Sequence, residues 1–264
     1  MPMGATSLTE RYEISLNTPR GRLTTTLDVP TSFVPVSALV PVVRQLGRNA
    51  QAAEEREVLT EGKTISCRAG CAACCRMLVP VSAPEAFALR DHVRSLPPEE
   101  RQAVTDRIEA SKQRLREAGM LERLESLGET SRPIGDEEMD PMNRAYYALR
   151  MPCPFLEDER CTIYDDRPSA CRELLVTSPA ELCQDLAANA VVPLPVSVRV
   201  STVLGLAWAD LMQAAPVLIP LPLALDWADR HAADSQRAWS GGDLFDRVLD
   251  KIWRLLSQSM DARQ

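Results

Sequence analysis

CRAGCAACC, residues 67–75, places four cysteines in nine positions, and two of them, Cys74 and Cys75, are adjacent. Thiolates this close repel one another, so a chain that keeps them together needs a soft cation such as zinc or iron to remove the cost. A disulfide between adjacent cysteines explains the crowding less well, because their geometry does not suit a bridge. The stretch therefore predicts a metal or cluster site, with reactive redox thiols as the alternative.

Four more cysteines follow in a second segment, MPCPFLEDERCTIYDDRPSACRELLVTSPAELC, residues 151–183. Stretches of seven, nine and eleven residues separate them, and each stretch can turn and return its cysteine to a shared point. Pro168 predicts the first turn of a short helix that carries Cys171. We predict that both segments supply ligands, and the candidates are Cys67, Cys71, Cys74, Cys75, Cys153, Cys161, Cys171 and Cys183.

The other side chains near the thiols narrow the choice of metal. The chain has two histidines, His92 and His231, and neither lies in a cysteine segment. A sulfur-dominated site selects zinc, iron–sulfur or copper(I) over magnesium or calcium. Arginines beside the thiols would offset the negative charge of such a site, unless they are ordinary exposed residues of an arginine-rich chain; they are Arg68, Arg76, Arg160, Arg167 and Arg172.

The flanking sequence is mainly helical. Apolar and polar residues alternate on both sides of a turn, which predicts a β-hairpin over residues 11–28. A helix with Ser37 as its N-cap runs toward the first cysteines, and Ser82 and Glu85 form a capping box that opens the next helix. Residues 131–140 read as an acidic loop, and Asp140-Pro141 as the start of a helix that ends near Arg150.

These elements predict a mainly α fold, in which a helical domain surrounds a cysteine-rich core and carries a small N-terminal hairpin. We expect one domain over residues 1–264, made of the hairpin 11–28, the cysteine-cluster region 64–185 and a C-terminal helical region 195–259. Three helices in the last region supply most of the hydrophobic mass.

Composition excludes some classes of partner. The formal charge of −7 disfavours a nucleic-acid binder, which needs a basic face to neutralise phosphates. The first residues lack a secretory signal, and no apolar run is long enough to span a membrane. We therefore expect a cytoplasmic protein without a membrane or nucleic-acid partner, which acts on an unknown protein or small molecule. Cysteines in such a reducing compartment serve as ligands or redox groups more often than as disulfides.

The cysteine segments resemble the CxxCxxCC family, also called YkgJ-like cysteine-cluster proteins, which are described as zinc- or iron-chelating domains. The resemblance rests on CRAGCAACC, on CPFLEDERCTIYDDRPSACRELL and on Cys183, and it covers roughly residues 64–185. The first gap holds three residues where the family's name has two. The family is marked by eight cysteines, and all eight of this chain's fall on its pattern, so the resemblance implies a chelated metal or an iron–sulfur centre. A related group, the flagellin lysine methylases, transfers methyl groups from S-adenosylmethionine, but nothing outside the cysteine pattern points to that substrate.

Several functions fit the cysteines. We favour an iron–sulfur protein, with a [4Fe–4S] cluster and a redox or group-transfer role, because the irregular gaps differ from compact zinc-knuckle spacing. The alternatives are a structural zinc protein, whose thiolates hold two loops together for partner binding, and a protein that passes on iron or copper. The spacing of Cys67, Cys71 and Cys74 also matches a radical S-adenosylmethionine enzyme, which needs alternating strands and helices that this sequence lacks.

The number of centres stays open at this point. Eight thiolates could hold two four-cysteine sites, or a single cluster could use four and leave the others as zinc ligands or free thiols. Because Cys74 and Cys75 are adjacent in the chain, we expect their side chains to point in different directions. That orientation favours two centres, or one cluster with a spare thiol.

Overall fold

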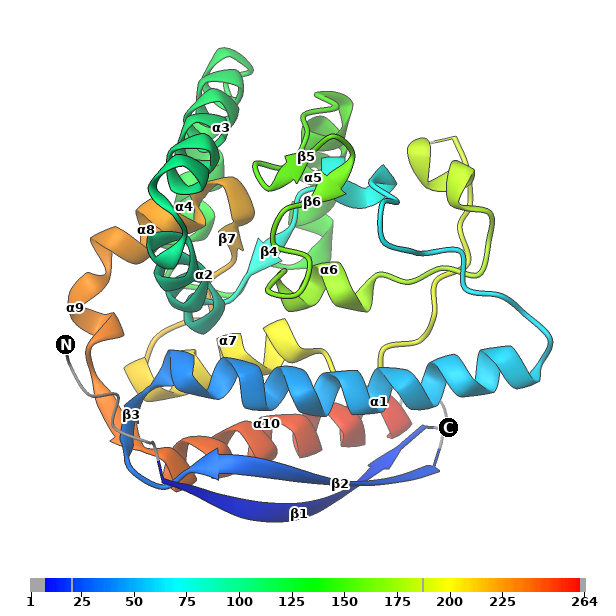
Figure 1. The fold of residues 1–264 in the computed structure, drawn as a ribbon, viewed down its shortest axis with the longest axis vertical. Coiled ribbons are helices and arrows are strands. Elements are labelled where there is room, and N and C mark those ends of the chain that lie inside the picture. The colour runs from blue at the N-terminus through cyan, green and yellow to red at the C-terminus, as the bar shows by residue number, and fades with distance from the viewer. Residues whose placement is uncertain (1–7, 20, 187, 262–264) are drawn as a thin grey trace.

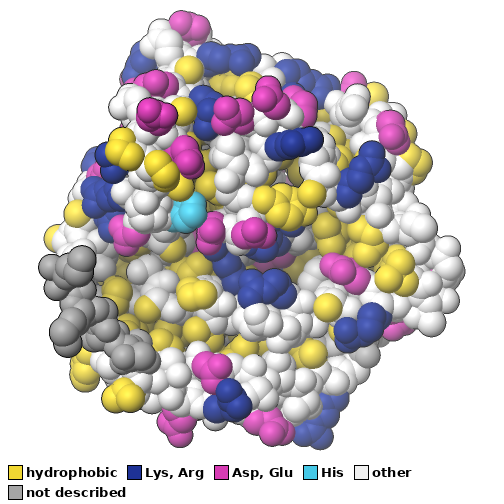
Figure 2. Space-filling model, in the orientation of Figure 1, with side chains coloured by type: hydrophobic (Ala, Val, Ile, Leu, Met, Phe, Trp, Pro, Cys, Tyr) yellow, Lys and Arg dark blue, Asp and Glu magenta, His cyan; other side chains and the backbone are white. Residues whose placement is uncertain are grey.

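The computed structural model describes residues 8–19, 21–186 and 188–261. Helices make up most of it, and a long two-stranded ribbon lies along one side (Figure 1). Side chains of both charges are mixed over the face drawn in Figure 2. The predicted mainly α fold with a small N-terminal hairpin is therefore confirmed, whereas the single domain over 1–264 stays a prediction. No helix in the described ranges combines the length and apolar character that crossing a bilayer requires.

The hairpin consists of β1 (Thr9–Thr18) and β2 (Gly21–Pro30), paired antiparallel with Leu16 opposite Leu23. Alternate residues face the core, as the period of two requires. The buried ones are Ile14, Leu16, Leu27 and Val29. Gly21 closes the turn at a φ of 109°, a conformation that a residue with a Cβ adopts rarely.

Helix α1 (Val40–Thr60) crosses the molecule and packs against β2 of the hairpin (Figure 1). The predicted cap at Ser37 is wrong. Residues Val36–Leu39 form a 3₁₀ turn, and the α-helix begins at Val40 with Pro41 in its first turn, where the missing N–H costs nothing. Gly47 allows close contact with the next layer, because a Cβ there would lie 2.4 Å from a methyl carbon of Val200.

The second group of helices follows the first cysteine segment. It comprises α2 (Ala83–Ser95), α3 (Pro98–Glu117), α4 (Leu121–Leu127) and α5 (Asp136–Ala148). The predicted capping box of Ser82 and Glu85 is confirmed. Helix α5 begins at Asp136, before the start predicted at Asp140-Pro141, so Pro141 lies inside it. The earlier start is favourable because three acidic residues from Asp136 onward suit the positive end of the helix dipole.

The C-terminal region forms α7 (Val200–Met212), α8 (Ala224–Arg230), α9 (Ala232–Ser235) and α10 (Gly241–Asp261). Phe87 of α2 is fully buried between Trp208 and Trp227, with both ring centroids 5.5 Å away. The indole N–H of Trp227 donates to the carbonyl of Gly128 at 2.8 Å. These aromatic contacts join the second group of helices to the C-terminal group.

Short strand pairs connect segments that are far apart in the chain. β3 (Phe33–Pro35) pairs with β8 (Ala238–Ser240), and β4 (Pro80–Val81) pairs with β7 (Ile219–Pro220). β5 (Leu156–Glu157) and β6 (Arg160–Cys161) form a tight hairpin within the second cysteine segment. Each sheet in the described residues has two strands, so the partial barrel of a radical S-adenosylmethionine enzyme is not built there.

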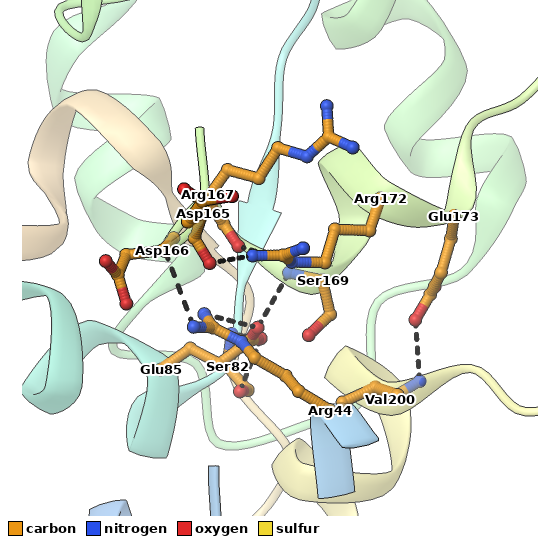
Figure 3. Close-up of polar contacts among 10 residues, drawn as sticks. All are labelled: Arg44, Ser82, Glu85, Asp165, Asp166, Arg167, Ser169, Arg172, Glu173 and Val200. Carbon is orange, nitrogen blue, oxygen red and sulfur yellow. Dashed lines mark hydrogen bonds and ion pairs between the residues drawn. The ribbon is translucent and has the colours of Figure 1, made fainter. Parts of the chain in front are cut away.

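Glu85 joins three helices at the base of the second cysteine segment (Figure 3). Its carboxylate is fully buried, accepts the hydroxyl of Ser82 at 2.9 Å and the backbone N–H of Ser169 at 2.8 Å, and lies 3.4 Å from the guanidinium of Arg44. Burial alone would raise the pKa of Glu85, but Arg44 and the Ser169 N–H outweigh it and hold that pKa below its usual range. The residue therefore fixes α6 (Ser169–Glu173), the helix that carries Cys171, to α1 and α2.

We expect Phe87→Ala to lower the free energy of unfolding by about 3–5 kcal/mol, because it leaves a cavity between two tryptophans. Urea unfolding measures the change. The control is Leu59→Ala, whose side chain is 56% exposed and which should stay within about 0.5 kcal/mol. Equal changes in the two variants would contradict this account of the core.

Glu85→Gln tests the buried ion pair through its pH dependence. A lowered folded pKa stabilises the protein above the unfolded pKa of about 4.3, and this stabilisation is lost as the pH falls through the folded pKa. Wild type should exceed the variant in unfolding free energy by about 3 kcal/mol at pH 7, and the gap should narrow below about pH 4. Denaturant titrations across this range measure it, with exposed Glu122→Gln as the control. A gap that is the same at pH 3 and pH 7 would refute the assignment.

Candidate metal centre

The first cysteine segment forms a loop that ends in a short turn. The backbone N–H of Cys71 donates to the carbonyl of Arg68, and Gly70 adopts a φ of 86° to allow that turn. Residues Ala73–Arg76 then form a 3₁₀ turn, which holds Cys74 and Cys75. The tight backbone brings these thiols together on one side of the loop.

The second segment supplies its cysteines from three different elements. Cys153 precedes the β5–β6 hairpin and Cys161 ends it, Cys171 lies in α6, and Cys183 lies in a 3₁₀ turn over Ala180–Gln184. The predicted short helix at Cys171 is confirmed, with Pro168 as its N-cap. Glu85 positions that helix, as described above.

Backbone hydrogen bonds join the two segments directly. The N–H of Cys153 donates to the carbonyl of Cys75 at 2.7 Å, and the N–H of Ser66 donates to the carbonyl of Val176 at 3.0 Å. The N–H of Val176 also donates to the sulfur of Cys67 at 3.3 Å. Backbone N–H groups therefore hold the two segments together through hydrogen bonds.

A tyrosine on α5 holds the last cysteine in place. The Tyr147 hydroxyl lies 2.8 Å from the carbonyl of Gln184 and 3.3 Å from that of Cys183. The guanidinium of Arg150 stacks over the Tyr147 ring, 4.2 Å from its centroid. These contacts keep the turn that carries Cys183 against the helical frame.

A small, partly open cavity of about 60 Å³ lies where the segments meet. Three cysteines of each segment line it, namely Cys71, Cys74, Cys75, Cys153, Cys161 and Cys171. Its remaining wall is largely apolar and includes Val79, Phe155, Leu156, Ile163 and Leu221. Cys67 and Cys183 do not line this cavity, which we call the cysteine cavity.

The thiols influence one another electrostatically. The interaction between the two neighbouring thiols lowers the pKa of Cys74 to about 7 and raises that of Cys75. Both residues line the cysteine cavity, and the expectation that their side chains point apart stays a prediction. Burial raises the pKa of Cys153 to about 12, and the neighbouring thiols Cys161 and Cys74 add to the increase.

Cys74 affects the pKa of more cysteines than one segment holds. A charge on Cys74 raises the pKa of thiols in both segments, namely Cys67, Cys75, Cys153, Cys161, Cys171 and Cys183. All eight cysteines are free thiols of intermediate burial. Among the described residues, no three side chains of His, Cys, Asp or Glu are arranged so that they could hold a metal ion as they stand.

The donor set nevertheless fits a soft metal. Sulfur is the ligand atom that zinc and iron–sulfur clusters take from proteins, and six thiols surround one apolar-walled space. That each of the eight cysteines is a ligand stays a prediction. The arginines predicted near the thiols have different surroundings. Arg167 lines the cysteine cavity, whereas Arg76 forms an ion pair with Glu159 at 2.6 Å.

Sequence reasoning missed residues that reach the site from other elements. Leu221, which lies far along the chain, closes part of the cavity wall. Arg44, Arg48 and Gln51 of α1 line a pocket together with residues of the second segment. Their spacing of four and three residues marks one helix face, which is the only local signal they carry.

Comparison with known proteins agrees with this site. Residues 66–187 match the model of the CxxCxxCC family, whose description is "Putative zinc- or iron-chelating domain". No curated protein and no solved structure matches the chain. The match spans every cysteine described above, and the cysteines provide the donors that such chelation needs. Residues 66–187, a little under half of the chain, are therefore similar to the CxxCxxCC family, whose described role is chelation of zinc or iron.

Proposed function

We propose that the cysteine cavity holds an iron–sulfur cluster of the [4Fe–4S] type, which serves redox or group-transfer chemistry. The observation that carries this proposal is the number of thiols around one space. Six cysteines from both segments line this cavity, which is enough for the four thiolates that a [4Fe–4S] cluster takes. A multi-iron core presents several faces and can draw thiolates from both segments.

The surroundings of the cavity support the same proposal. Apolar walls exclude water, and Arg167 places a positive charge beside the thiols. Burial and positive charge near the sulfurs tune the potential of an iron–sulfur cluster. When bound, such a cluster would supply one-electron chemistry, and the chain itself would supply the thiolates and exclude solvent. The eight free thiols suit a reducing compartment, so we place the protein in the cytoplasm.

Cysteine-to-serine variants purified without oxygen test this proposal. We expect wild type to contain iron and acid-labile sulfide and to absorb in the visible range. Cys153→Ser and Cys171→Ser should lose most of both, because each removes a thiolate from the cavity wall. Cys67→Ser and Cys183→Ser should retain more, since their sulfurs lie outside it. Iron, sulfide and zinc analysis of each preparation measures the outcome.

The matched control is Ala73→Ser, which adds a hydroxyl to the same loop without removing a thiol. It should keep the wild-type iron and sulfide. Stoichiometric zinc without sulfide in wild type would contradict the cluster and favour the structural zinc protein. Equal retention in all four cysteine variants would contradict the cavity as the centre.

A further inference from the structure

A second, larger pocket adjoins the cysteine cavity. It has a volume of about 570 Å³ and lies between α1 and the second cysteine segment. Tyr164 and Arg167 line both spaces, and Cys67 lines the larger one. Figure 2 shows basic side chains in a hollow near the middle of this face, and Figure 3 shows arginines of the pocket from α1 and from the second segment. We call it the arginine pocket.

The pocket has an excess of positive charge. Four guanidinium groups line it against two carboxylates, Glu55 and Glu173, and the latter already accepts the Val200 N–H at 2.8 Å. The four guanidinium groups belong to Arg44, Arg48, Arg167 and Arg172.

Carboxylates do not neutralise most of these arginines. In the ranges that the structure describes, Arg48, Arg167 and Arg172 form no ion pair with Asp or Glu. Arg172 donates to the backbone carbonyls of Asp165 and Arg167, and the guanidinium of Arg167 stacks over the Tyr164 ring, 4.1 Å from its centroid. Burial lowers the pKa of Arg172, and the charges of Arg167, Arg44 and Arg48 lower it further. Arginines that lie this close repel one another, and a bound anion would offset the repulsion.

Buried donors at the pocket also lack acceptors. The Nε atoms of Arg44 and Arg167 and the side-chain nitrogen of Gln51 are buried without a hydrogen-bond partner in the described part of the chain. All three residues line the arginine pocket. A buried donor without an acceptor is costly, and most native proteins contain few of them. Since Arg44, Arg167 and Gln51 line the pocket, an anionic group there would lie beside two positive charges that are incompletely hydrogen-bonded.

We propose that the arginine pocket binds a small molecule through a carboxylate or phosphate group. The planar fork of arginine matches both groups, because each offers paired oxygens. The volume falls in the range of small-molecule sites. Since the pocket shares Arg167 and Tyr164 with the cysteine cavity, the bound molecule would lie beside the metal centre. This proposal goes beyond the proposed function, because it holds whichever metal the cysteines bind.

Calorimetric titration of the anaerobically purified, metal-loaded protein at fixed salt tests the pocket. The probes are inorganic phosphate, succinate and succinamide, the last being a neutral analogue of succinate. We expect saturable one-site binding of phosphate or succinate and none of succinamide, and the stronger of the two anions identifies the group that is recognised. Arg48→Gln and Arg172→Gln should each weaken that binding about tenfold or more, because each removes a charged donor.

Two controls separate this proposal from its rivals. Arg123→Gln removes one exposed positive charge outside the pocket and should leave the affinity unchanged. Arg48 is exposed, and within the described ranges its guanidinium hydrogen-bonds to the side chain of Gln45 alone, so its variant should fold even if the Arg172 variant does not. Absence of saturable anion binding, or an equal loss in Arg123→Gln, would overturn the proposal.

Metal analysis of the same preparations distinguishes the remaining outcomes. Unchanged metal content with weakened anion binding supports a ligand pocket. Reduced metal content with unchanged anion binding would show that the arginines only offset the charge of the thiolates, and the proposal would be wrong. Wild type without metal that still binds the anion would contradict the proposed function and leave the arginine pocket standing.

Discussion

Eight thiols crowd into one region of this protein, and the cost of ionising them together governs the site. Cys74 acts on thiols of both segments, so removing a proton there raises the pKa of six other cysteines. Without a cation, burial and mutual repulsion keep most of these thiols protonated. A metal that binds thiolate displaces those protons, and its affinity must then increase with pH. A bound metal would therefore let these cysteines ionise together.

The surrounding helices hold the two cysteine segments in positions that bring their thiols close together. Glu85 fixes α6 to α1 and α2, while Tyr147 fixes the turn of Cys183 to α5. The Cys153 N–H joins the segments at Cys75. The same frame brings a basic face of α1 against the second segment, so the arginine pocket and the cysteine cavity share a wall. A negatively charged ligand and a negatively charged thiolate centre can then use the same positive residue, Arg167.

Local sequence patterns predicted much of the fold and part of the candidate site. Alternation predicted the hairpin, and the capping box at Ser82 and Glu85 predicted the start of α2, because both depend on neighbouring residues alone. The start of α5 was missed because an acidic run suits a solvated loop and a helix N-terminus equally well. The arginine pocket could not be predicted either. Arg44 and Arg172 are far apart in sequence, and tertiary packing alone brings them together.

The central claim is that thiols of both segments converge on one metal centre. Mass-spectrometric mapping of cysteine alkylation, on protein isolated without oxygen, tests it most directly. The account predicts that Cys74, Cys75, Cys153 and Cys171 are protected together in the metal-loaded protein and become reactive together when the metal is removed. It would be contradicted if Cys153 and Cys171 reacted equally fast with and without metal while Cys74 and Cys75 were protected.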